Sequence, residues 1–222
     1  FISFDSIEII SRTSKKKINI KNIKYLPLRI KKKVSIDIKN ICKNKTIPGL
    51  KFKNLPLLMG VLNLTPDSFS DGGNFIKTKL AKKQINKLIN DGAKIIDIGG
   101  ESTRPGSKEV LESIEWNRIE NSLKYLKKIK FFVSLDSRKS HVMKNALSFK
   151  INLINDVSGL SYDKYTINFL KNTKLPFVLH HIKGNPKTMQ INPSYRNVLL
   201  DVYDYFENKL KVIRKNRINH NN

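Results

Sequence analysis

From residue 57 onward, two patterns of hydrophobic and polar positions alternate along the chain. Short apolar runs are each followed by a stretch whose apolar residues recur three and four positions apart, the spacing of an amphipathic helix. We expect buried strands at residues 57–64, 95–99, 131–135, 151–154 and 176–180. We expect the helices after them at residues 76–89, 116–126, 142–147, 163–172 and 198–213. The alternation predicts an α/β fold of five β-α units, with parallel strands and crossover helices.

Residues 1–56 do not follow this alternation. They contain strand-like pieces interrupted by lysine runs at 15–17 and 31–33, and they contain no catalytic motif. The strand-like pieces are 1–10, 17–23 and 33–38. We interpret this segment as a basic N-terminal extension, separate from a main domain at 57–222. It is either a strand pair against the main domain or the remnant of a preceding domain.

The charge of the chain changes this picture little. The formal net charge is +25, but 35 of the 43 basic residues are lysine and only 8 are arginine. Lysine, asparagine and isoleucine have A/T-rich codons, so codon bias explains the charge without a nucleic-acid partner, which would call for more arginine. No apolar run is long enough to cross a membrane. The single cysteine, Cys42, fits a reducing compartment, so we expect a cytoplasmic location.

Polar residues at the strand ends distinguish two possible architectures. A doubly wound nucleotide-binding sheet usually has a glycine-rich fingerprint after its first strand, and none is present. Instead, all five strands have a polar residue at or just past their carboxyl end, as the strands of a (β/α)8 barrel do at its active face. These residues are Asn63, Asp97, Asp136, Asn155 and His181. We therefore expect a TIM-type (β/α)8 barrel, incomplete because only five of eight β-α units are present.

Two of these residues have both a structural and a functional interpretation. Asn63 precedes a Thr-Pro-Asp turn, which its amide could cap, or its carbonyl could bind Mg²⁺, which prefers oxygen ligands. Asp97 lies within a strand that looks buried on both faces. A carboxylate is costly there unless it is paired, so Asp97 either lines a pocket or makes a structural hydrogen bond.

The remaining strand ends suggest an anion and a heterocycle as ligands. Thr103 and Arg104 lie in a glycine-flanked loop and could bind a phosphate or carboxylate, or Arg104 could pair with Glu101 on a solvated loop. Asp136 and Asn155, side by side, would offer an acceptor and an amide to an amino-substituted heterocycle. The two histidines at 180–181 fit no zinc pattern, so we interpret them as hydrogen-bonded strand-end residues.

Two long stretches resemble one known family. Residues 59–73 (MGVLNLTPDSFSDGG) and 92–107 (GAKIIDIGGESTRPGS) resemble the two signature stretches of the dihydropteroate synthases. Shorter matches at 133–137, 153–160 and 181–190 follow in the order of that family. The resemblance implies a cytosolic transferase of folate biosynthesis. Such an enzyme joins p-aminobenzoate to 6-hydroxymethyl-7,8-dihydropterin diphosphate and releases pyrophosphate.

The resemblance also implies roles for individual residues, although it assigns no catalytic base. Asn63 corresponds to the family's Mg²⁺ ligand beside the substrate pyrophosphate. Thr103 and Arg104 correspond to loop residues that engage the pyrophosphate and the second substrate. The resemblance implies a pterin pocket that contains Asp136 and Asn155, with Asp97 near them. It also implies that Phe69 and Pro105 line the p-aminobenzoate and sulfonamide site.

The family's later motifs are missing from this sequence. After the fifth helix the family continues with a DPGFGFGK-like strand end and further Lys and Arg residues, whereas this chain ends at Asn222. We therefore expect the N-terminal portion of a synthase, either a fragment or the product of a decaying gene. The alternative to an enzyme is an inactive remnant or a pterin-binding fragment. A homodimer is one option for the full-length form, whose oligomeric state the sequence leaves open.

Overall fold

The computed structural model divides the chain into two compact units. It describes residues 4–43, 47–50, 56–65, 74–104, 106–184 and 188–218. The first unit comprises Phe1–Lys45 with Tyr195–Tyr205, and the second comprises Thr46–Ser194 with Phe206–Asn222. The boundary that we predict between residues 56 and 57 remains a proposal. The structure adds that a later segment, 195–205, clusters with the N-terminal unit.

The first unit is a β-hairpin followed by helices. Strands β1 (Ser6–Ile10) and β2 (Lys15–Asn19) pair antiparallel, and a 3-10 helix, η1 (Ile20–Tyr25), leads to helix α1 (Leu28–Cys42). Arg12, in the hairpin turn, forms ion pairs with Asp201 and Asp204. The strand-like pieces at 1–10 and 17–23 thus contribute two strands that pair with each other, and the ion pairs connect their hairpin to segment 195–205.

The strand expected at 33–38 is wrong, because these residues lie inside α1. Val34 and Ile38 are one helical turn apart and are the apolar residues of α1 that are partly buried. Lysine favours helix almost as strongly as leucine, so the run at 31–33 continues the helix and does not interrupt it. The hydrophobic pattern of this segment has helical spacing, which a six-residue window is too short to reveal.

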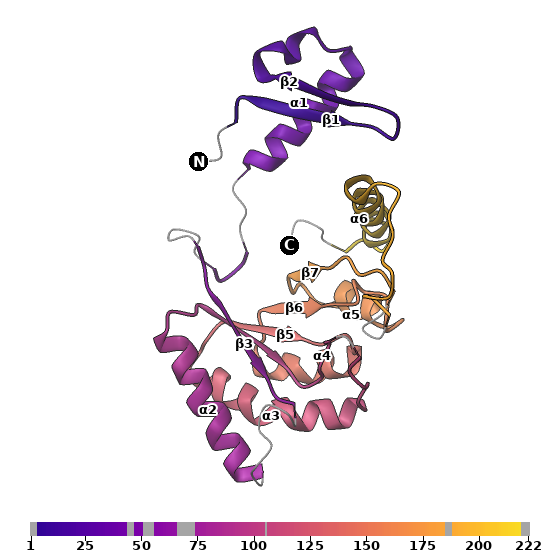
Figure 1. The fold of residues 1–222 in the computed structure, drawn as a ribbon. Coiled ribbons are helices and arrows are strands. Elements are labelled where there is room, and N and C mark those ends of the chain that lie inside the picture. Colours follow the sequence, from indigo (N-terminus) through magenta and orange to yellow (C-terminus); the bar gives the residue numbers. More distant parts are fainter. Residues whose placement is uncertain are drawn as a thin grey trace. The chain divides into compact units, whose positions relative to one another are not determined.

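The second unit contains a five-stranded parallel sheet (Figure 1). Its strands are β3 (Met59–Asn63), β4 (Ile95–Gly99), β5 (Val133–Asp136), β6 (Leu153–Asp156) and β7 (Phe177–Leu179). Its helices are α2 (Asn74–Asn90), α3 (Glu112–Lys128), α4 (Ser140–Ala146) with the 3-10 turn η3 (Leu147–Phe149), and α5 (Thr166–Asn172). Helix α6 (Val198–Lys215) begins in segment 195–205 of the first unit and ends in the second. Each predicted strand and helix of the main domain is therefore confirmed, with bounds shifted by a few residues.

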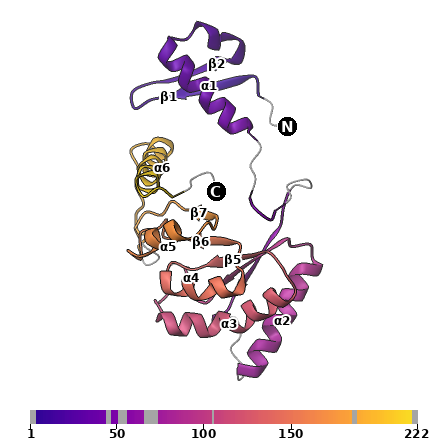
Figure 2. The same ribbon diagram turned by 180° about the vertical axis from the view of Figure 1, so that it is seen from behind.

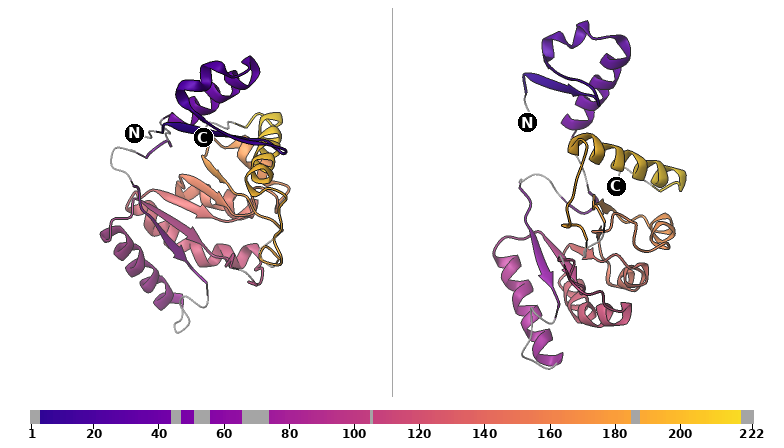
Figure 3. Two further views of the ribbon diagram at one scale, coloured as in Figure 1. Left: turned by 45° about the horizontal axis from the view of Figure 1, so that its top comes forward. Right: turned by 45° about the vertical axis from the view of Figure 1, so that its right-hand side comes forward.

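The order of the strands identifies the architecture. The sheet runs β3-β4-β5-β6-β7, so every strand lies beside the one before it and the order never reverses. A doubly wound sheet reverses its order at a switch point, whereas a barrel does not. Each crossover connection between parallel strands is right-handed, and here each leads to the next strand in the same direction across the sheet. The crossover helices therefore lie on one side of the sheet. The two opposite views and the tilted views show α2, α3, α4 and α5 along that side (Figures 2 and 3). The fold is five units of a (β/α)8-type barrel wall.

The hydrophobic core lies between the strands and these helices. The helix-facing strand residues are almost completely buried, and so are the helix residues that pack against them. They include Leu62, Ile96, Ile98, Leu135 and Ile154 from the strands and Ile85, Ile119, Leu123 and Met143 from the helices. Burial of these side chains is the main stabilising contribution to this unit. None of the helices in the described part of the chain is long and apolar enough to cross a membrane.

The expectation of a fully buried first strand is wrong. On β3, Gly60 and Leu62 face the helices and are buried, but Met59 and Val61 on the other face are 40% and 54% exposed. Within the described residues β3 pairs only with β4, so it forms an edge of the sheet. Its second face therefore has a neighbouring strand on one side only. The apolar run predicts a strand correctly, but the run alone does not show which faces are covered.

Candidate ligand site at the carboxyl edge of the sheet

One row of residues crosses the sheet at the carboxyl ends of its strands. The strand pairing aligns Asn63 with Gly99, Gly99 with Asp136, Asp136 with Asn155, and Asn155 with Val178. Residues aligned in a parallel sheet project from the same face, and neighbouring strands are about 4.8 Å apart. The predicted site residues Asn63, Asp136 and Asn155 are therefore brought to one edge and one face. We call the five aligned residues the strand-end row: Asn63, Gly99, Asp136, Asn155 and Val178.

Gly99 leaves an open position in the strand-end row. A Cβ atom at this residue would lie 3.1 Å from Oδ2 and 3.3 Å from Cβ of Asp136. A side chain at position 99 would therefore press against the Asp136 carboxyl group. Its absence leaves space between Asn63 and Asp136, on the face where the polar side chains gather.

Asp97 lies two residues before Gly99 on β4, on the same face as the strand-end row, and it is hydrogen-bonded to Asn155 of that row. It aligns with Ser134 on β5 and is only 6% exposed. The Asn155 amide nitrogen donates to Asp97 Oδ2 at 3.0 Å. Asp97 Oδ1 and Ser134 Oγ, on these two neighbouring strands, are both shielded from solvent.

Burial changes the proton affinity of both carboxyl groups. It raises the pKa of Asp97, although the nearby Ser134 and Asn155 side chains lower it in part. Burial also raises the pKa of Asp136 to about 7, and the negative charge of Asp97 adds to this effect. At neutral pH the Asp136 carboxyl group can therefore either donate or accept a hydrogen bond. That versatility suits recognition of a heterocycle with adjacent donors and acceptors.

His180 is a member of the site that the sequence analysis left out. It follows β7 directly, and its Nε2 lies 2.6 Å from Asn155 Oδ1. The expectation of a hydrogen-bonded strand-end histidine is confirmed, but its partner is the predicted pterin-pocket residue Asn155. The signal lies in the alternation, because His180 is two residues after Val178 and so shares the face of the strand-end row. His181, the predicted strand-end residue, packs instead near Phe206.

The loop after β4 is held by ion pairs from the next β-α unit. Glu101 bonds to Arg138 Nε at 3.0 Å and to Lys139 Nζ at 3.1 Å. The alternative in which Glu101 pairs with Arg104 is therefore wrong. Burial raises the pKa of Glu101, but the hydrogen bond from Arg138 and the other donors outweigh it and hold that pKa below its usual range. The carboxylate thus stays ionised.

Glu101 and Lys139, which interact at the start of this loop, also hold its far end at Val110. The Val110 backbone N–H donates to Glu101 Oε1 at 3.0 Å, and Lys139 Nζ donates to the Val110 carbonyl at 2.7 Å. Thr103 and Arg104 lie between these anchors; Thr103 is partly buried and Arg104 is exposed. The predicted residues Phe69 and Pro105 lie outside the described residues.

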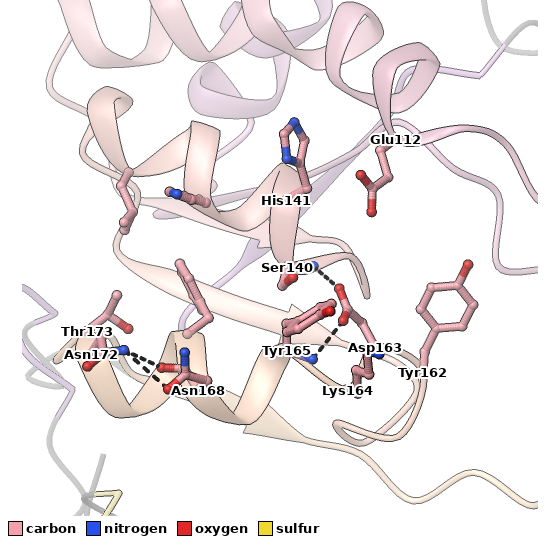
Figure 4. A pocket seen from close by; sticks show the side chains of 13 residues that line it. Glu112, Ser140, His141, Tyr162, Asp163, Lys164, Tyr165, Asn168, Asn172 and Thr173 are labelled. Carbon is pink, nitrogen blue, oxygen red and sulfur yellow. Dashed lines mark hydrogen bonds between the residues drawn. The ribbon is translucent and has the colours of Figure 1, made fainter.

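A hollow in the surface lies away from the strand-end row. It has a volume of about 920 Å³ and lies between α4 and α5, with Ser140, Asp163 and Asn168 among its lining residues (Figure 4). Asp163 accepts hydrogen bonds from the backbone N–H groups of Ser140 and Tyr165, which fixes the wall of the hollow. None of the predicted site residues that the structure describes lines it.

The described residues contain no cluster of three or more His, Cys, Asp or Glu side chains that could hold a metal ion. Asn63, partly buried at the end of β3, supplies a single amide oxygen. Mg²⁺ is often held by one or two protein oxygens together with substrate phosphates and water. The residues present therefore fit a metal that arrives with a phosphorylated substrate better than one held by the protein alone.

Comparisons with known proteins agree with this architecture. A family model described as pterin binding enzyme matches residues 59–222. The dihydropteroate synthase of Haemophilus influenzae is 40% identical over 157 residues, which cover 70% of this chain and 57% of that protein. The chain thus spans just over half the length of this curated relative.

Solved structures show the same likeness. The Yersinia pestis dihydropteroate synthase in complex with a sulfonamide drug matches with a TM-score of 0.69 and 35% identity, over 78% of this chain and 64% of that one. The Xanthomonas albilineans dihydropteroate synthase with 4-aminobenzoic acid matches with a TM-score of 0.67 and 31% identity, over 75% and 59% of the two chains. The resemblance to dihydropteroate synthases is confirmed, and the chain belongs to the pterin-binding enzyme family.

Proposed function

We propose that this chain takes part in dihydropteroate synthesis and contributes the pterin-binding wall of the active site. The reaction would condense p-aminobenzoate with 6-hydroxymethyl-7,8-dihydropterin diphosphate and release pyrophosphate. The observation that carries this proposal is the strand-end row, in which Asp136 and Asn155 lie side by side next to the open position at Gly99. Membership of the pterin-binding family and the 4-aminobenzoic acid named for a similar structure support the same reaction.

The row can recognise the pterin through its hydrogen-bonding edge. Asp136, with its pKa near 7, can meet a ring N–H or a ring nitrogen, and the Asn155 amide offers a donor and an acceptor beside it. Asp97 supports Asn155 from below through the 3.0 Å hydrogen bond. These groups bind and orient the ring. We assign no residue to proton abstraction, because an aryl amine attacks a cationic pterin methylene without a strong base.

We place the diphosphate group of the substrate at the Asn63 end of the strand-end row, beside the open position at Gly99. Asn63 would hold Mg²⁺ through its amide oxygen, together with the diphosphate oxygens of the substrate. When bound, such an ion stabilises the negative charge that develops on departing pyrophosphate. Thr103 and Arg104, on the loop closed by Glu101 and Val110, would add a hydroxyl and a guanidinium to the same anion. The proposal places this chemistry in the cytosol, in line with a single cysteine.

Pterin binding by the purified chain tests the proposal. Titration calorimetry with 6-hydroxymethyl-7,8-dihydropterin should show binding at one site, and Asp136→Ala should weaken it at least tenfold. Asp91→Ala, at an exposed position outside the row, is the control and should bind as the wild type does. Absence of binding, or equal binding by the Asp136 variant, would contradict the proposal.

A product assay extends the test to the reaction. Purified chain is incubated with pterin diphosphate, Mg²⁺ and radiolabelled p-aminobenzoate, and labelled dihydropteroate is separated by chromatography. Binding without product would assign to this chain the pterin-binding wall alone. Product that depends on Asp136 would assign to it the complete reaction.

A further inference from the structure

His180 is held against the predicted pterin pocket by a short hydrogen bond. Its Nε2 lies 2.6 Å from Asn155 Oδ1, while Asn155 Nδ2 lies 3.0 Å from Asp97 Oδ2. Three side chains from three different strands or strand ends are thus linked in series. All three are at least partly buried, so water competes weakly for these bonds.

The chemistry of the three groups determines which atom is the donor at each contact. The amide NH₂ of Asn155 donates to Asp97 Oδ2, so the NH₂ group faces Asp97. The amide oxygen of Asn155 must then face His180. Because an amide oxygen can only accept, the ring of His180 must carry a hydrogen on Nε2. In this series His180 therefore donates to Asn155, and Asn155 donates to Asp97.

This series leaves Asn155 with a defined remaining capacity. One N–H of its amide is used by Asp97 and one lone pair of its oxygen by His180, so one N–H and one lone pair remain. Without His180, the carbonyl side of the amide would lose its protein partner in this series. The amide could then rotate away from the strand-end row, or turn its oxygen toward a ligand atom that needs a donor.

We propose that His180 is a positioning residue that sets the orientation of the Asn155 amide and thereby the selectivity of the site for the hydrogen-bonding edge of a pterin. This inference rests on the proposed function for the identity of the ligand. The orientation itself rests only on the contacts within the chain. His180 acts through Asn155 and is not required to touch the reacting atoms.

The first measurement tests the orientation without any ligand. Long-range ¹H–¹⁵N spectra of the ligand-free protein should show His180 as the Nε2–H tautomer near pH 7.5. The side-chain NH₂ signals of Asn155 should be split and slow to exchange, and they should move in His180→Leu. An Nδ1–H tautomer with a bare Nε2 would overturn the proposal, whatever the protein binds.

The second measurement tests the consequence for binding. His180→Leu should weaken the binding of 6-hydroxymethyl-7,8-dihydropterin about tenfold, the size expected for one lost hydrogen bond. His180→Gln keeps an N–H donor near the position of Nε2 and should bind within about threefold of the wild type. His141→Leu, at an exposed histidine of α4, is the matched control and should bind normally.

The outcomes separate this inference from the proposed function. Thermal unfolding of each variant shows whether it is folded, and His180→Gln provides a test even when His180→Leu does not fold. Equal binding by the wild type and His180→Leu, or no recovery in His180→Gln, would overturn the positioning role. A wild-type protein that binds no pterin would overturn the proposed function and the ligand named here, while the tautomer would still decide the orientation.

Discussion

Lys139 and Glu115 form an ion pair that is almost completely removed from solvent. Lys139 Nζ lies 2.8 Å from Glu115 Oε2, and the two side chains are 2% and 0% exposed. Lys139 also bonds to Glu101 and to the Val110 carbonyl, so one ammonium group joins α3 to the two ends of the loop that carries Thr103 and Arg104. The attraction must offset the cost of burying these charges, and so the pair matters most when it is broken.

Replacing Lys139 by Met should destabilise the protein by about 3–5 kcal/mol, because Glu115 loses its buried partner. Urea unfolding followed by circular dichroism measures this change. Lys211→Met is the matched control, since Lys211 pairs with Glu207 at 3.7 Å on the surface and should contribute less than about 1 kcal/mol. The double variant K139M/E115L should recover part of the loss. A loss of similar size in both single variants would contradict the role given to the buried pair.

Asp136 should make the stability of the protein fall as the pH rises. Its pKa is about 7 in the folded protein and about 3.9 in an unfolded chain, so the folded state binds more protons between these values. The free energy of unfolding should therefore decrease from pH 4 toward pH 7. Asp136→Asn should remove this dependence and be more stable than the wild type at pH 8, by up to about 4 kcal/mol. Unfolding curves across this pH range measure the difference.

The exposed carboxyl group of Asp91 provides the control for this experiment. Asp91→Asn should follow the wild-type curve at every pH. If the free energy of unfolding of Asp136→Asn changed with pH in the same way as that of the wild type, burial would not raise the pKa of Asp136. A stabilised but weakly binding Asp136→Asn variant would indicate that the site keeps this carboxyl group for recognition at the expense of stability.

Gly100 should not tolerate alanine. A Cβ at this position would lie 2.6 Å from the Glu115 carbonyl oxygen and 3.0 Å from Ile119 Cγ2, so α3 would have to move. We expect Gly100→Ala to destabilise the protein by about 1–3 kcal/mol in chemical denaturation. Gly60→Ala is the comparison, because its Cβ would meet only the Leu88 side chain at 3.1–3.2 Å, which can shift. A larger loss for Gly60→Ala would contradict this account.

Asn63 should determine how much Mg²⁺ strengthens the binding of a diphosphate. In titration calorimetry the wild type should bind the pterin diphosphate more tightly with Mg²⁺ than without it. Asn63→Ala should reduce that gain at least tenfold, whereas Asn63→Asp keeps an oxygen ligand and should retain most of it. Binding of the unphosphorylated pterin should not change in either variant. An unchanged gain in Asn63→Ala would return Asn63 to the role of a turn-capping residue.

Local patterns in the sequence were sufficient to predict that three members of the strand-end row meet at one edge of the sheet. Each of Asn63, Asp136 and Asn155 ends an apolar run that precedes a helical pattern, and parallel strands bring such ends to one edge. The fold class follows from the same repeat. The exposed face of β3 could not be predicted, because the apolar run does not show how many strands flank it.

Contacts between distant residues were beyond the sequence. Nothing in the local pattern connects Glu101 to Lys139 or His180 to Asn155, since these pairs form only when their strands lie side by side. The strand expected at 33–38 failed for a different reason. Its apolar residues fit both a short strand and a helix, and the longer helix from 28 to 42 resolves the ambiguity.

The strict β3-β4-β5-β6-β7 order of the sheet has a consequence for how the protein is made. Strands leave the ribosome in the order in which they stand in the sheet, so each new strand meets a neighbour that has already been synthesised. Every pairing closes a chain segment of only one β-α unit, which keeps the entropy cost of each step small. The strand-end row would then be assembled residue by residue from Asn63 to Val178. The Asp136 and Asn155 pair would be completed only when β6 docks during translation.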